Sequence, residues 1–325
     1  MQTLHQIQSA FEKYLRELSF GSDPDNLYRP VRYILSLGGK RLRPVVLLLC
    51  HKLYDDDISP AMPAAAAIEV FHNFTLVHDD IMDEAPLRRG KPTVHHKFDT
   101  NKAILSGDVM LVLAYDYLLR LQNQTLIPTV SRIFTQTAIE VCEGQQMDMD
   151  FEERTNVSVE EYLRMIELKT SVLVAAAMKI GALTGGASDA DAQKLYEFGR
   201  NLGIAFQLQD DLLDTFGDPE KFGKQPGGDI IQNKKTYLFL KALELADDHT
   251  RTELLEWYSN TDFDEEEKIA GVKSIFTRLD IPAQTKRLQT EFEGKAMEQL
   301  NGLDAPSEKI EWLKAFAEGL MKREF

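Results

Sequence analysis

The interval between apolar residues constrains the fold of this chain more than any other feature of its sequence. Long segments place apolar residues three and four positions apart, whereas the two-residue alternation of half-buried strands is scarce. One such stripe consists of Leu195, Phe198, Leu202, Phe206, Leu212 and Phe216. Side chains at this interval share one face of an α-helix. The sequence therefore predicts an all-α fold.

Helix start signals indicate where several of these segments begin. Ser158 and Glu161 have the spacing of a capping box, Ser188 precedes Asp191 by the same interval, and Ser59 stands before a first-turn proline. We expect the helix at Ser59 to continue towards residue 83. The first twenty residues have the pattern of an amphipathic surface helix. Further helices are predicted near residues 102–121, 124–151, 234–247, 283–301 and 307–321.

Size, charge and cysteine content exclude several classes of protein. The 325 residues carry a formal net charge of −15, which disfavours a nucleic-acid or anionic-membrane partner. Cys50 and Cys142 lie in apolar stretches and give no support for a disulfide framework, and no run of about 18 apolar residues could span a bilayer. The composition does not change abruptly between Pro60 and Leu240. We expect a cytoplasmic protein with no membrane span and a single domain over residues 1–325.

Two segments carry the same pattern of aspartates in otherwise unrelated surroundings. Residues 79–83 read DDIMD and residues 210–214 read DDLLD. On an α-helix the first and fifth positions are about 40° apart and about 6 Å along the axis, so their carboxylates can share one cation. Mg²⁺ takes one or two protein carboxylates and completes its shell with water and phosphate. Each motif is therefore a candidate Mg²⁺ site for a diphosphate.

One such motif alone is weak evidence, because acidic pairs are common at helix ends and on solvated surfaces. Two motifs, each at the end of an otherwise apolar helix, favour a metal, since an unpaired charge near a core is costly. The basic residues could form exposed turns, but their position beside glycines also suits an anion site. The clusters are GGKRLRP at 38–44, RRG at 88–90, Lys169-Thr170, Lys224 and Lys234-Lys235.

Taken together, these motifs resemble those of the trans-prenyltransferases that make farnesyl, geranylgeranyl and longer polyprenyl diphosphates. The resemblance runs from about Gly38 to Thr236, in one order along the chain. It rests on GGKRLRP, His72, DDIMD, RRG, Gly144-Gln145, Lys169-Thr170, Gln207 before DDLLD, Gly217-Asp218, Gly223-Lys224 and Asp229. The resemblance implies an isoprenoid synthase type I fold. This is a single large helical bundle with a central active-site cavity, across whose mouth the aspartate motifs face each other.

The resemblance also implies a role for each matching residue. Three Mg²⁺ ions would join the motifs to an allylic diphosphate, with Asp79 and Asp83 as ligands of two ions and Asp210 of the third. The remaining catalytic aspartates would be Asp80, Asp211 and Asp214. The residues implied to contact the allylic diphosphate are Arg88, Lys169, Thr170, Gln207, Lys224 and Lys234. Those implied to hold isopentenyl diphosphate are Lys40, Arg43, His72 and Arg89. A homodimer is expected on the same ground.

The implied reaction begins when Mg²⁺ and basic side chains stabilise the leaving diphosphate as the allylic C–O bond breaks. Isopentenyl diphosphate then attacks the allylic cation, and the departing pyrophosphate takes the proton. Two alternatives are weighed against it. A class I terpene cyclase needs no second diphosphate site and usually replaces the second aspartate motif by an Asn/Asp, Ser/Thr, Glu pattern. A non-catalytic partner subunit would have lost the site residues that are present here.

Product length in this family is implied to depend on the side chains below the first aspartate motif. Thr75 and Phe74 stand four and five residues before Asp79. Helix geometry places Thr75 about 40° and Phe74 about 140° from Asp79, whereas the resemblance assigns the pocket floor to Phe74. An aromatic ring at the floor should stop elongation early. We expect a short product, geranylgeranyl diphosphate ahead of farnesyl diphosphate.

Overall fold

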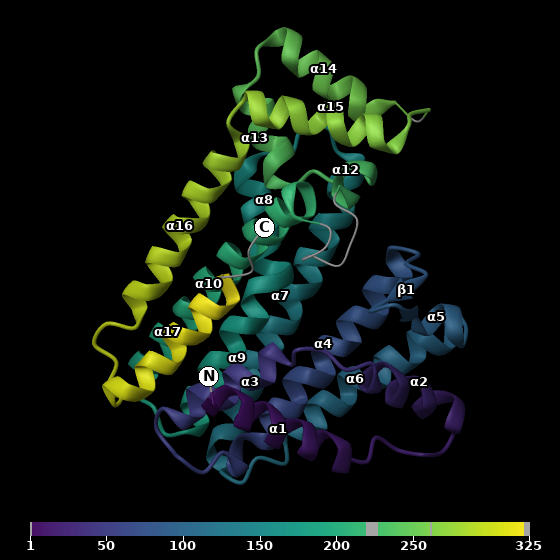
Figure 1. The fold of residues 1–325 in the computed structure, drawn as a ribbon. Coiled ribbons are helices and arrows are strands. Elements are labelled where there is room, and N and C mark those ends of the chain that lie inside the picture. Colours follow the sequence, from purple (N-terminus) through teal and green to yellow (C-terminus); the bar gives the residue numbers. More distant parts are fainter. Residues whose placement is uncertain (1, 219–226, 261, 322–325) are drawn as a thin grey trace. The chain divides into compact units, whose positions relative to one another are not determined.

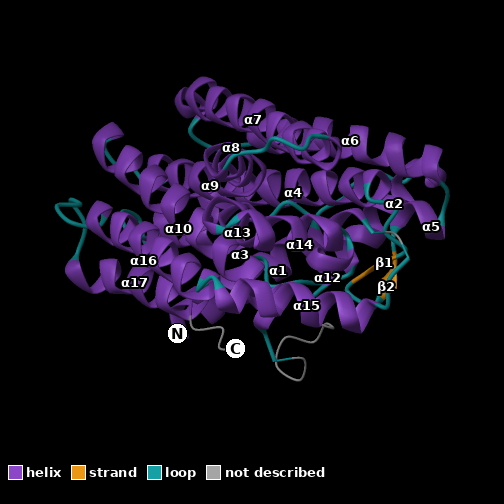
Figure 2. Ribbon diagram, turned by 90° about the horizontal axis from the view of Figure 1, so that it is seen from above, coloured by secondary structure: helices purple, strands orange, loops and turns teal. Residues whose placement is uncertain are grey.

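The computed structural model describes residues 2–218, 227–260 and 262–321, and most of these residues are helical (Figure 1). Within these ranges the only strands are β1 (Leu87–Arg88) and β2 (Lys91–Pro92), which form an antiparallel hairpin (Figure 2). The predicted all-α fold is confirmed. No helix in the described ranges is both long and apolar enough to cross a membrane.

The chain forms two compact units, of which the first contains the described residues up to Thr135, Ala176–Tyr196 and Asp304–Leu313. The elements that lie wholly in this unit, besides the hairpin, precede residue 127. They are α1 (Gln2–Glu17), α2 (Asp25–Ser36), α3 (Leu42–Lys52), the 3₁₀ turn η1 (Ser59–Ala61), α4 (Met62–Met82), α5 (Val94–Lys97), α6 (Thr100–Leu118) and the 3₁₀ turn η2 (Gln124–Leu126).

The second unit contains Gln136–Ala175, Glu197–Leu303 and the described residues from Lys314 onwards. Its own elements are α8 (Val159–Ile166), the π-helical turn η3 (Glu167–Ser171), α12 (Gly228–Ile231), α13 (Tyr237–Leu245), α14 (Asp248–Ser259), α15 (Glu265–Arg278) and α16 (Ile281–Gln299). Four helices contribute residues to both units: α7 (Ile127–Glu153), α9 (Val172–Thr184), α10 (Asp189–Phe216) and α17 (Ser307–Met321). One domain over residues 1–325 stays a prediction.

Two of the three predicted helix starts have the predicted cap. The side chain of Ser158 accepts a hydrogen bond from the backbone N–H of Glu161, whose carboxylate accepts one from the Ser158 backbone, which is a capping box. Ser188 Oγ likewise accepts from the backbone N–H of Asp191 at 3.1 Å. The prediction for Ser59 is wrong in its detail. Residue 59 begins a 3₁₀ turn, its backbone N–H donates to Asp57 at 3.0 Å, and α4 begins only at Met62.

Helix α4 carries the first aspartate motif at its carboxyl end. The helix has contacts with α1, α2, α3, α5 and α6, all in the first unit. Its run Ala64–Ala67 is fully buried, and small side chains of this kind let neighbouring backbones come close. Burial continues to Val77, and DDIMD follows within the last turns. The motif is therefore attached to the part of the first unit that is most firmly packed.

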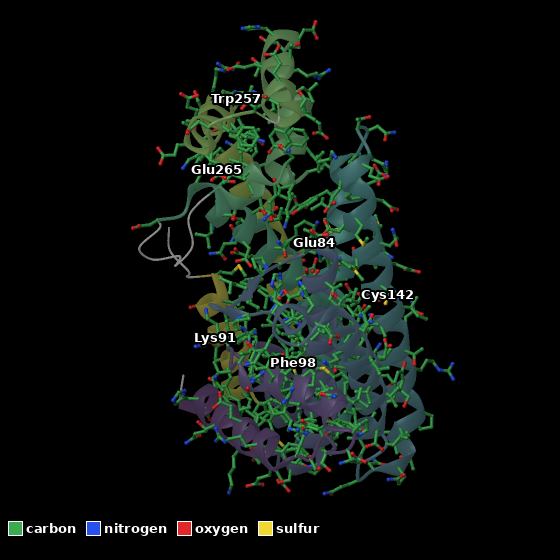
Figure 3. The ribbon with its side chains drawn as sticks, turned by 90° about the vertical axis from the view of Figure 1, so that its right-hand side faces the viewer. Glu84, Lys91, Phe98, Cys142, Trp257 and Glu265 are labelled. Atoms are coloured by element: carbon green, nitrogen blue, oxygen red, sulfur yellow. The ribbon has the colours of Figure 1, made fainter. Side chains whose placement is uncertain are left out.

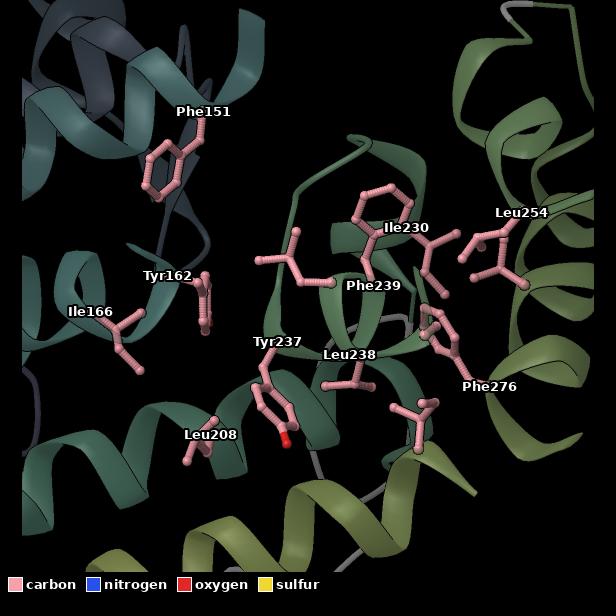
Figure 4. Packing of buried hydrophobic residues seen from close by; sticks show 14 of the residues in the cluster. Phe151, Tyr162, Ile166, Leu208, Ile230, Tyr237, Leu238, Phe239, Leu254 and Phe276 are labelled. Carbon is pink, nitrogen blue, oxygen red and sulfur yellow. The ribbon is translucent and has the colours of Figure 1, made fainter. Parts of the chain in front are cut away.

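A cluster of buried hydrophobic residues holds the second unit together (Figure 4). Tyr162 of α8, Leu208 of α10, Leu238 of α13 and Phe276 of α15 all belong to it. Each of these helices contributes its apolar face, as the intervals of three and four residues predict. The cluster reaches within two residues of the second aspartate motif, which starts at Asp210.

Helices α14 and α15 pack against each other through a ring and a glycine. Trp257 of α14, labelled in Figure 3, lies against Gly271 of α15, where an added Cβ would stand 2.6 Å from the indole. Any side chain at Gly271 would therefore displace the ring. Besides α14, α15 has contacts with α12, α13 and α16.

Candidate active site

The first aspartate motif presents its carboxylates in two directions. Asp79 and Asp83 reach solvent, whereas Asp80 is only 1% exposed. This division follows from helix geometry, because the first and fifth positions share a face and the second position points elsewhere. That Asp79 and Asp83 act as a pair on one cation stays a prediction.

Arg88 of the β1–β2 hairpin binds the buried carboxylate of the motif. Its Nε lies 2.9 Å from both oxygens of Asp80, and one of its Nη atoms lies 2.8 Å from Asp80 and 3.6 Å from Asp79. A guanidinium compensates a buried carboxylate well because its planar donors match the two oxygens. Arg88 thus fastens the hairpin to the motif. Its predicted contact with the allylic diphosphate stays a prediction.

The glycines of the GGKR segment contact Arg89, the second arginine of the hairpin. Gly38 and Gly39 have φ angles of 75° and 131°, which glycine adopts without strain. Arg89 donates a hydrogen bond to the carbonyl oxygen of Gly38, and a Cβ on Gly39 would stand 2.6 Å from the Arg89 guanidinium. Gly39 therefore leaves room for the guanidinium, and Gly38 supplies the positive φ angle of the turn.

Arg41, between the predicted ligands Lys40 and Arg43, points into the protein. It is in the left-handed conformation, with φ at 49°. Its guanidinium forms a buried ion pair with Glu69 of α4 and donates to the carbonyl oxygen of Leu35 at 2.5 Å. Arg41 therefore anchors the GGKR segment from inside, while Lys40 lies at the surface.

Arg43 and His72 lie in contact, with Arg43 Nη1 3.1 Å from His72 Nε2. A guanidinium only donates, so Nε2 must be the acceptor and the imidazole is neutral. Burial, and then Arg43, Arg89 and two further arginines, hold the pKa of His72 well below its usual range. Predicted residues from three separate segments thus form a cationic cluster in the first unit, and this cluster suits a polyanion.

In the second unit, Lys169 and Thr170 lie on the π-helical turn η3. Two glycines permit this turn to pack closely. A Cβ on Gly144 of α7 would overlap the backbone nitrogen of Lys169 and stand 2.8 Å from Leu168, and one on Gly203 of α10 would stand 2.8 Å from Ser171. π-helical turns are frequently found at functional sites. Lys169 also pairs with Asp148 of α7 at 2.6 Å, a partner that the sequence analysis did not identify.

Gln207 joins η3 to the second aspartate motif. Thr170 Oγ1 lies 3.5 Å from Gln207 Oε1, and Gln207 Nε2 lies 3.2 Å from a carboxylate oxygen of Asp211. The other oxygen of Asp211 accepts a hydrogen bond from the buried hydroxyl of Tyr162. Burial, and then the charge of Asp229, raise the pKa of Asp211 to about 7. Tyr162 could not be predicted from the sequence, because a tyrosine in an apolar stripe has the pattern of a core residue.

Asp214, at the end of the second motif, fastens the short helix α12. Its carboxylate accepts a hydrogen bond from the backbone N–H of Asp229 at 2.9 Å, and its carbonyl oxygen accepts one from Gly227 at 2.6 Å. Lys234 Nζ lies 3.7 Å from the carboxylate of Asp229. The remaining predicted ligand, Lys224, falls outside the described residues.

The residues of the predicted chain-length position lie on α4. The ring of Phe74 is 5.5 Å from that of Phe71 and 4.8 Å from that of His78, between ring centroids. Thr75 donates its hydroxyl proton to the carbonyl oxygen of His72 at 2.8 Å. His78 in turn packs on Gly107 of α6, where a Cβ would stand 2.5 Å from its Cδ2. The position of Phe74 is thus defined by aromatic neighbours within the first unit.

The two aspartate motifs offer the donor chemistry that Mg²⁺ uses. Asp83 is exposed and Asp79 and Asp210 are half-buried, with one carboxylate oxygen of Asp79 and one of Asp210 buried. In the part of the chain that the structure describes, no group of three or more His, Cys, Asp or Glu is placed to hold a metal by itself. A Mg²⁺ that keeps water and diphosphate oxygens needs only one or two carboxylates. The donor set therefore fits Mg²⁺ bound together with a diphosphate.

Comparison with known proteins supports the resemblance. The family model described as Polyprenyl synthetase matches residues 24–276. A geranylgeranyl diphosphate synthase of Methanosarcina mazei is 47% identical over 222 residues, which are 68% of each chain. A short chain isoprenyl diphosphate synthase of Methanothermobacter thermautotrophicus is 36% identical over all of this chain and 98% of its own.

Solved structures agree with these relatives. A crystal structure of a geranylgeranyl pyrophosphate synthase is similar over the full length of both chains, with a TM-score of 0.94 and 46% identity. The corresponding synthetase from Pyrococcus horikoshii has a TM-score of 0.93 and 33% identity over 99% of each chain. The fold thus matches that of known isoprenoid synthases, as predicted.

Proposed function

The chain belongs to the polyprenyl synthetase family and is a short-chain trans-prenyl diphosphate synthase, and on that premise we propose how its residues divide the reaction. In this proposal it condenses isopentenyl diphosphate with an allylic diphosphate, head to tail. Geranylgeranyl diphosphate is the favoured product and farnesyl diphosphate the next. Relatives and solved structures with geranylgeranyl synthase names support that preference.

The observation that carries the division of roles is the cationic cluster of the first unit. Arg43 and His72 are in contact, and Arg89 lies against the backbone of Gly38 and Gly39. We assign the diphosphate of isopentenyl diphosphate to this cluster and to the neighbouring Lys40. Each guanidinium is already oriented by its neighbours, so little conformational entropy is lost when the anion binds.

The allylic diphosphate is assigned to the residues around the aspartate motifs. Asp79 and Asp83 would hold two Mg²⁺ ions and Asp210 a third, and when bound these ions supply the Lewis acidity that draws charge from the C–O bond. Lys169 and Lys234 donate to the diphosphate oxygens. Arg88, Thr170, Gln207 and Lys224 are assigned to the same ligand, with Asp80, Asp211 and Asp214 as the supporting aspartates.

Two further features extend the proposal. Phe74 is assigned to the floor that limits product length, with Thr75 beside it. A second copy of the chain is assigned to a stripe along α6. The stripe consists of Leu105 and Val112 of the helix and Leu119 directly after it, which recur every seven residues and are between 58% and 65% exposed. Such a stripe of exposed apolar side chains marks an interaction surface. A homodimer in the cytoplasm is the state that we propose.

Incubation of the purified protein with labelled isopentenyl diphosphate and each of three allylic primers tests the proposed function. Chromatography of the dephosphorylated products should show an elongated prenyl alcohol, which chelation of Mg²⁺ abolishes and added Mg²⁺ restores. A terpene cyclase would instead release hydrocarbon from the primer alone, and a non-catalytic subunit would consume neither substrate. Condensation that continues in excess chelator would contradict the metal assignment.

Two variants test the division of roles. Arg43→Ala should raise the KM for isopentenyl diphosphate by about 10- to 100-fold and leave the primer KM within about twofold, because it removes one charged contact. Asp79→Ala should chiefly lower kcat. Arg29→Ala is the matched control, since Arg29 is an exposed arginine of the same unit that pairs with Asp25 at 3.8 Å. Identical effects of Arg43→Ala and Asp79→Ala on both substrates would refute the assignment.

A further inference from the structure

Lys268 is buried without a carboxylate partner. Its exposure is 0%, and it is the only fully buried lysine in the described ranges. Its Nζ lies 2.5 Å from Asn233 Oδ1, 4.0 Å from the ring centroid of Phe263 and 5.6 Å from that of Tyr258. No carboxylate of the described residues forms an ion pair with it. Burial lowers the pKa of this lysine from its usual value.

A buried ammonium group is costly unless its hydrogen bonds are satisfied. Here the ammonium group of Lys268 is stabilised by two aromatic rings and by a hydrogen bond to the amide oxygen of Asn233. A leucine or methionine would fill an apolar site of this kind without the cost of desolvating a charge. What the lysine adds over an apolar side chain is a directed hydrogen bond to Asn233.

Asn233 stands where the chain turns out of α12. Its φ angle is 56°, a left-handed conformation that residues other than glycine rarely adopt. Directly after it, the backbone N–H of Lys234 donates to the carbonyl oxygen of Asp229 at 2.9 Å, and Lys234 Nζ lies 3.7 Å from the Asp229 carboxylate. The side-chain contact with Lys268 therefore fixes the turn that sets the direction of Lys234.

The segment 227–234 is also hydrogen-bonded to the second aspartate motif. Asp214 accepts hydrogen bonds from the backbone of Asp229 and of Gly227, the residue directly before α12. Gly227 has a φ of 97° and no room for a side chain, because a Cβ would stand 2.7 Å from Ile269, the neighbour of Lys268. Helix α15 thus contacts both ends of the short segment 227–233, through Ile269 at Gly227 and Lys268 at Asn233.

We infer that Lys268 is a positioning residue for the allylic diphosphate site. It acts through Asn233 on Lys234 and Asp229 and, along α12, on Asp214. The inference rests on the proposed role of the second aspartate motif and of Lys234. It assigns a part in the reaction to helix α15, which lies beyond the last motif of the sequence.

The test compares Lys268→Met, Asn233→Gly and the double variant. Each single variant should lower kcat/KM for the allylic primer by about 10- to 100-fold, the usual effect of removing a partner that orients a ligand. The KM for isopentenyl diphosphate should stay within about twofold. The double variant should be no worse than the more affected single variant, because both changes remove the same contact. Asn233→Asp keeps an acceptor and tolerates a left-handed φ, so it should retain activity.

Lys295→Met is the matched control. Lys295 belongs to the same unit and stacks on Phe292 at 4.8 Å, but it is exposed and pairs with Glu291. Thermal unfolding of every variant separates loss of stability from loss of positioning. Should Lys268→Met not fold, Asn233→Gly against Asn233→Asp decides the question.

Two outcomes would overturn the inference. One is an unchanged kcat/KM in folded Lys268→Met or Asn233→Gly, and the other is additive losses in the double variant. Asp210→Ala is measured in parallel to separate the inference from the proposed function. If Asp210→Ala keeps full activity, the proposed function fails. If it abolishes activity while Lys268→Met does not change it, only the role of Lys268 is refuted.

Discussion

Replacing Gly144 by alanine should disable the enzyme without unfolding it. The added methyl group would overlap the backbone nitrogen of Lys169 and stand 2.8 Å from Leu168, both on the turn η3. Carbon atoms in ordinary contact are about 3.5 Å apart or more, so the turn must move by roughly 1 Å. Backbone atoms cannot rotate away as a flexible side chain can. The displacement therefore passes to Lys169 and Thr170, which the proposed function assigns to the allylic diphosphate.

The expected magnitude follows from this displacement. A misplacement of about 1 Å at a positioning group costs roughly 100-fold in rate, which is about 2.7 kcal/mol of activation free energy. Overpacking a well-packed site lowers the free energy of unfolding by about 1–3 kcal/mol. Gly144→Ala should therefore lose far more activity than a fall in the folded fraction explains. Steady-state kinetics with saturating isopentenyl diphosphate, together with denaturant unfolding, measure the two effects separately.

Gly294→Ala is the control for this prediction. Gly294 lies within α16 of the same unit, and an added Cβ would meet nothing within 4 Å. Alanine there should raise stability by about 0.5–1 kcal/mol, because glycine loses more backbone entropy in a helix. Activity should not change. If Gly144→Ala kept more than half of the activity, η3 would have to tolerate the shift, and the argument from close packing would be refuted.

Four further predictions concern the first unit. Phe74→Ala should lengthen the product by at least one isoprene unit, measured by chromatography; an unchanged product distribution would place the floor elsewhere. Val112→Lys on the exposed stripe of α6 should halve the mass found by light scattering, and an unchanged mass would exclude this stripe as the dimer surface. Arg41→Leu should lower the free energy of unfolding by about 3–5 kcal/mol, because it leaves Glu69 charged and buried. Changing both residues to leucine should recover most of that loss, and a double variant as unstable as Arg41→Leu would refute the prediction. Because the pKa of His72 is lowered in the folded protein, the free energy of unfolding should be highest above about pH 6.5 and should fall as the pH falls towards the folded pKa, with a slope of at most about 1.4 kcal/mol per pH unit. Urea unfolding of His72→Gln should show a flatter dependence of this free energy on pH, and parallel curves for the two proteins would contradict the prediction.

Residue spacing predicted those parts of the molecule that a single helix determines. The stripes at intervals of three and four become buried helix faces, and the capping box at Ser158 forms as its spacing requires. Asp79 and Asp83 both reach solvent at the end of α4, as expected of residues four positions apart on a helix. These features need no knowledge of the tertiary structure, so the sequence contains all the information they require.

Ion pairs between segments far apart in the sequence could not be predicted from residue spacing. No local pattern indicates that Asp80 binds Arg88 or that Asp148 binds Lys169. Lys268 follows three glutamates and has the pattern of a solvated helix start, yet it is fully buried. The π-helical turn η3 likewise cannot be predicted from side-chain spacing, because it is defined by which carbonyl oxygen accepts the hydrogen bond of each backbone N–H. The glycines at 144 and 203 were its only signal, since glycine inside a helix suggests close packing.

Three of the basic residues assigned to the allylic diphosphate, all in the described ranges, share one property that bears on how the site selects its ligand. Arg88 lies against Asp80, Lys169 against Asp148, and Lys234 near Asp229, each within its own unit. Such partners hold the cations in fixed positions and offset much of their charge before any substrate binds. A bare diphosphate thus meets cations whose field is already reduced, in a chain with a net charge of −15. On the proposed assignment, a diphosphate that carries Mg²⁺ would also satisfy the carboxylates of Asp79, Asp83 and Asp210. We therefore expect the site to favour the metal complex of the substrate over the free anion.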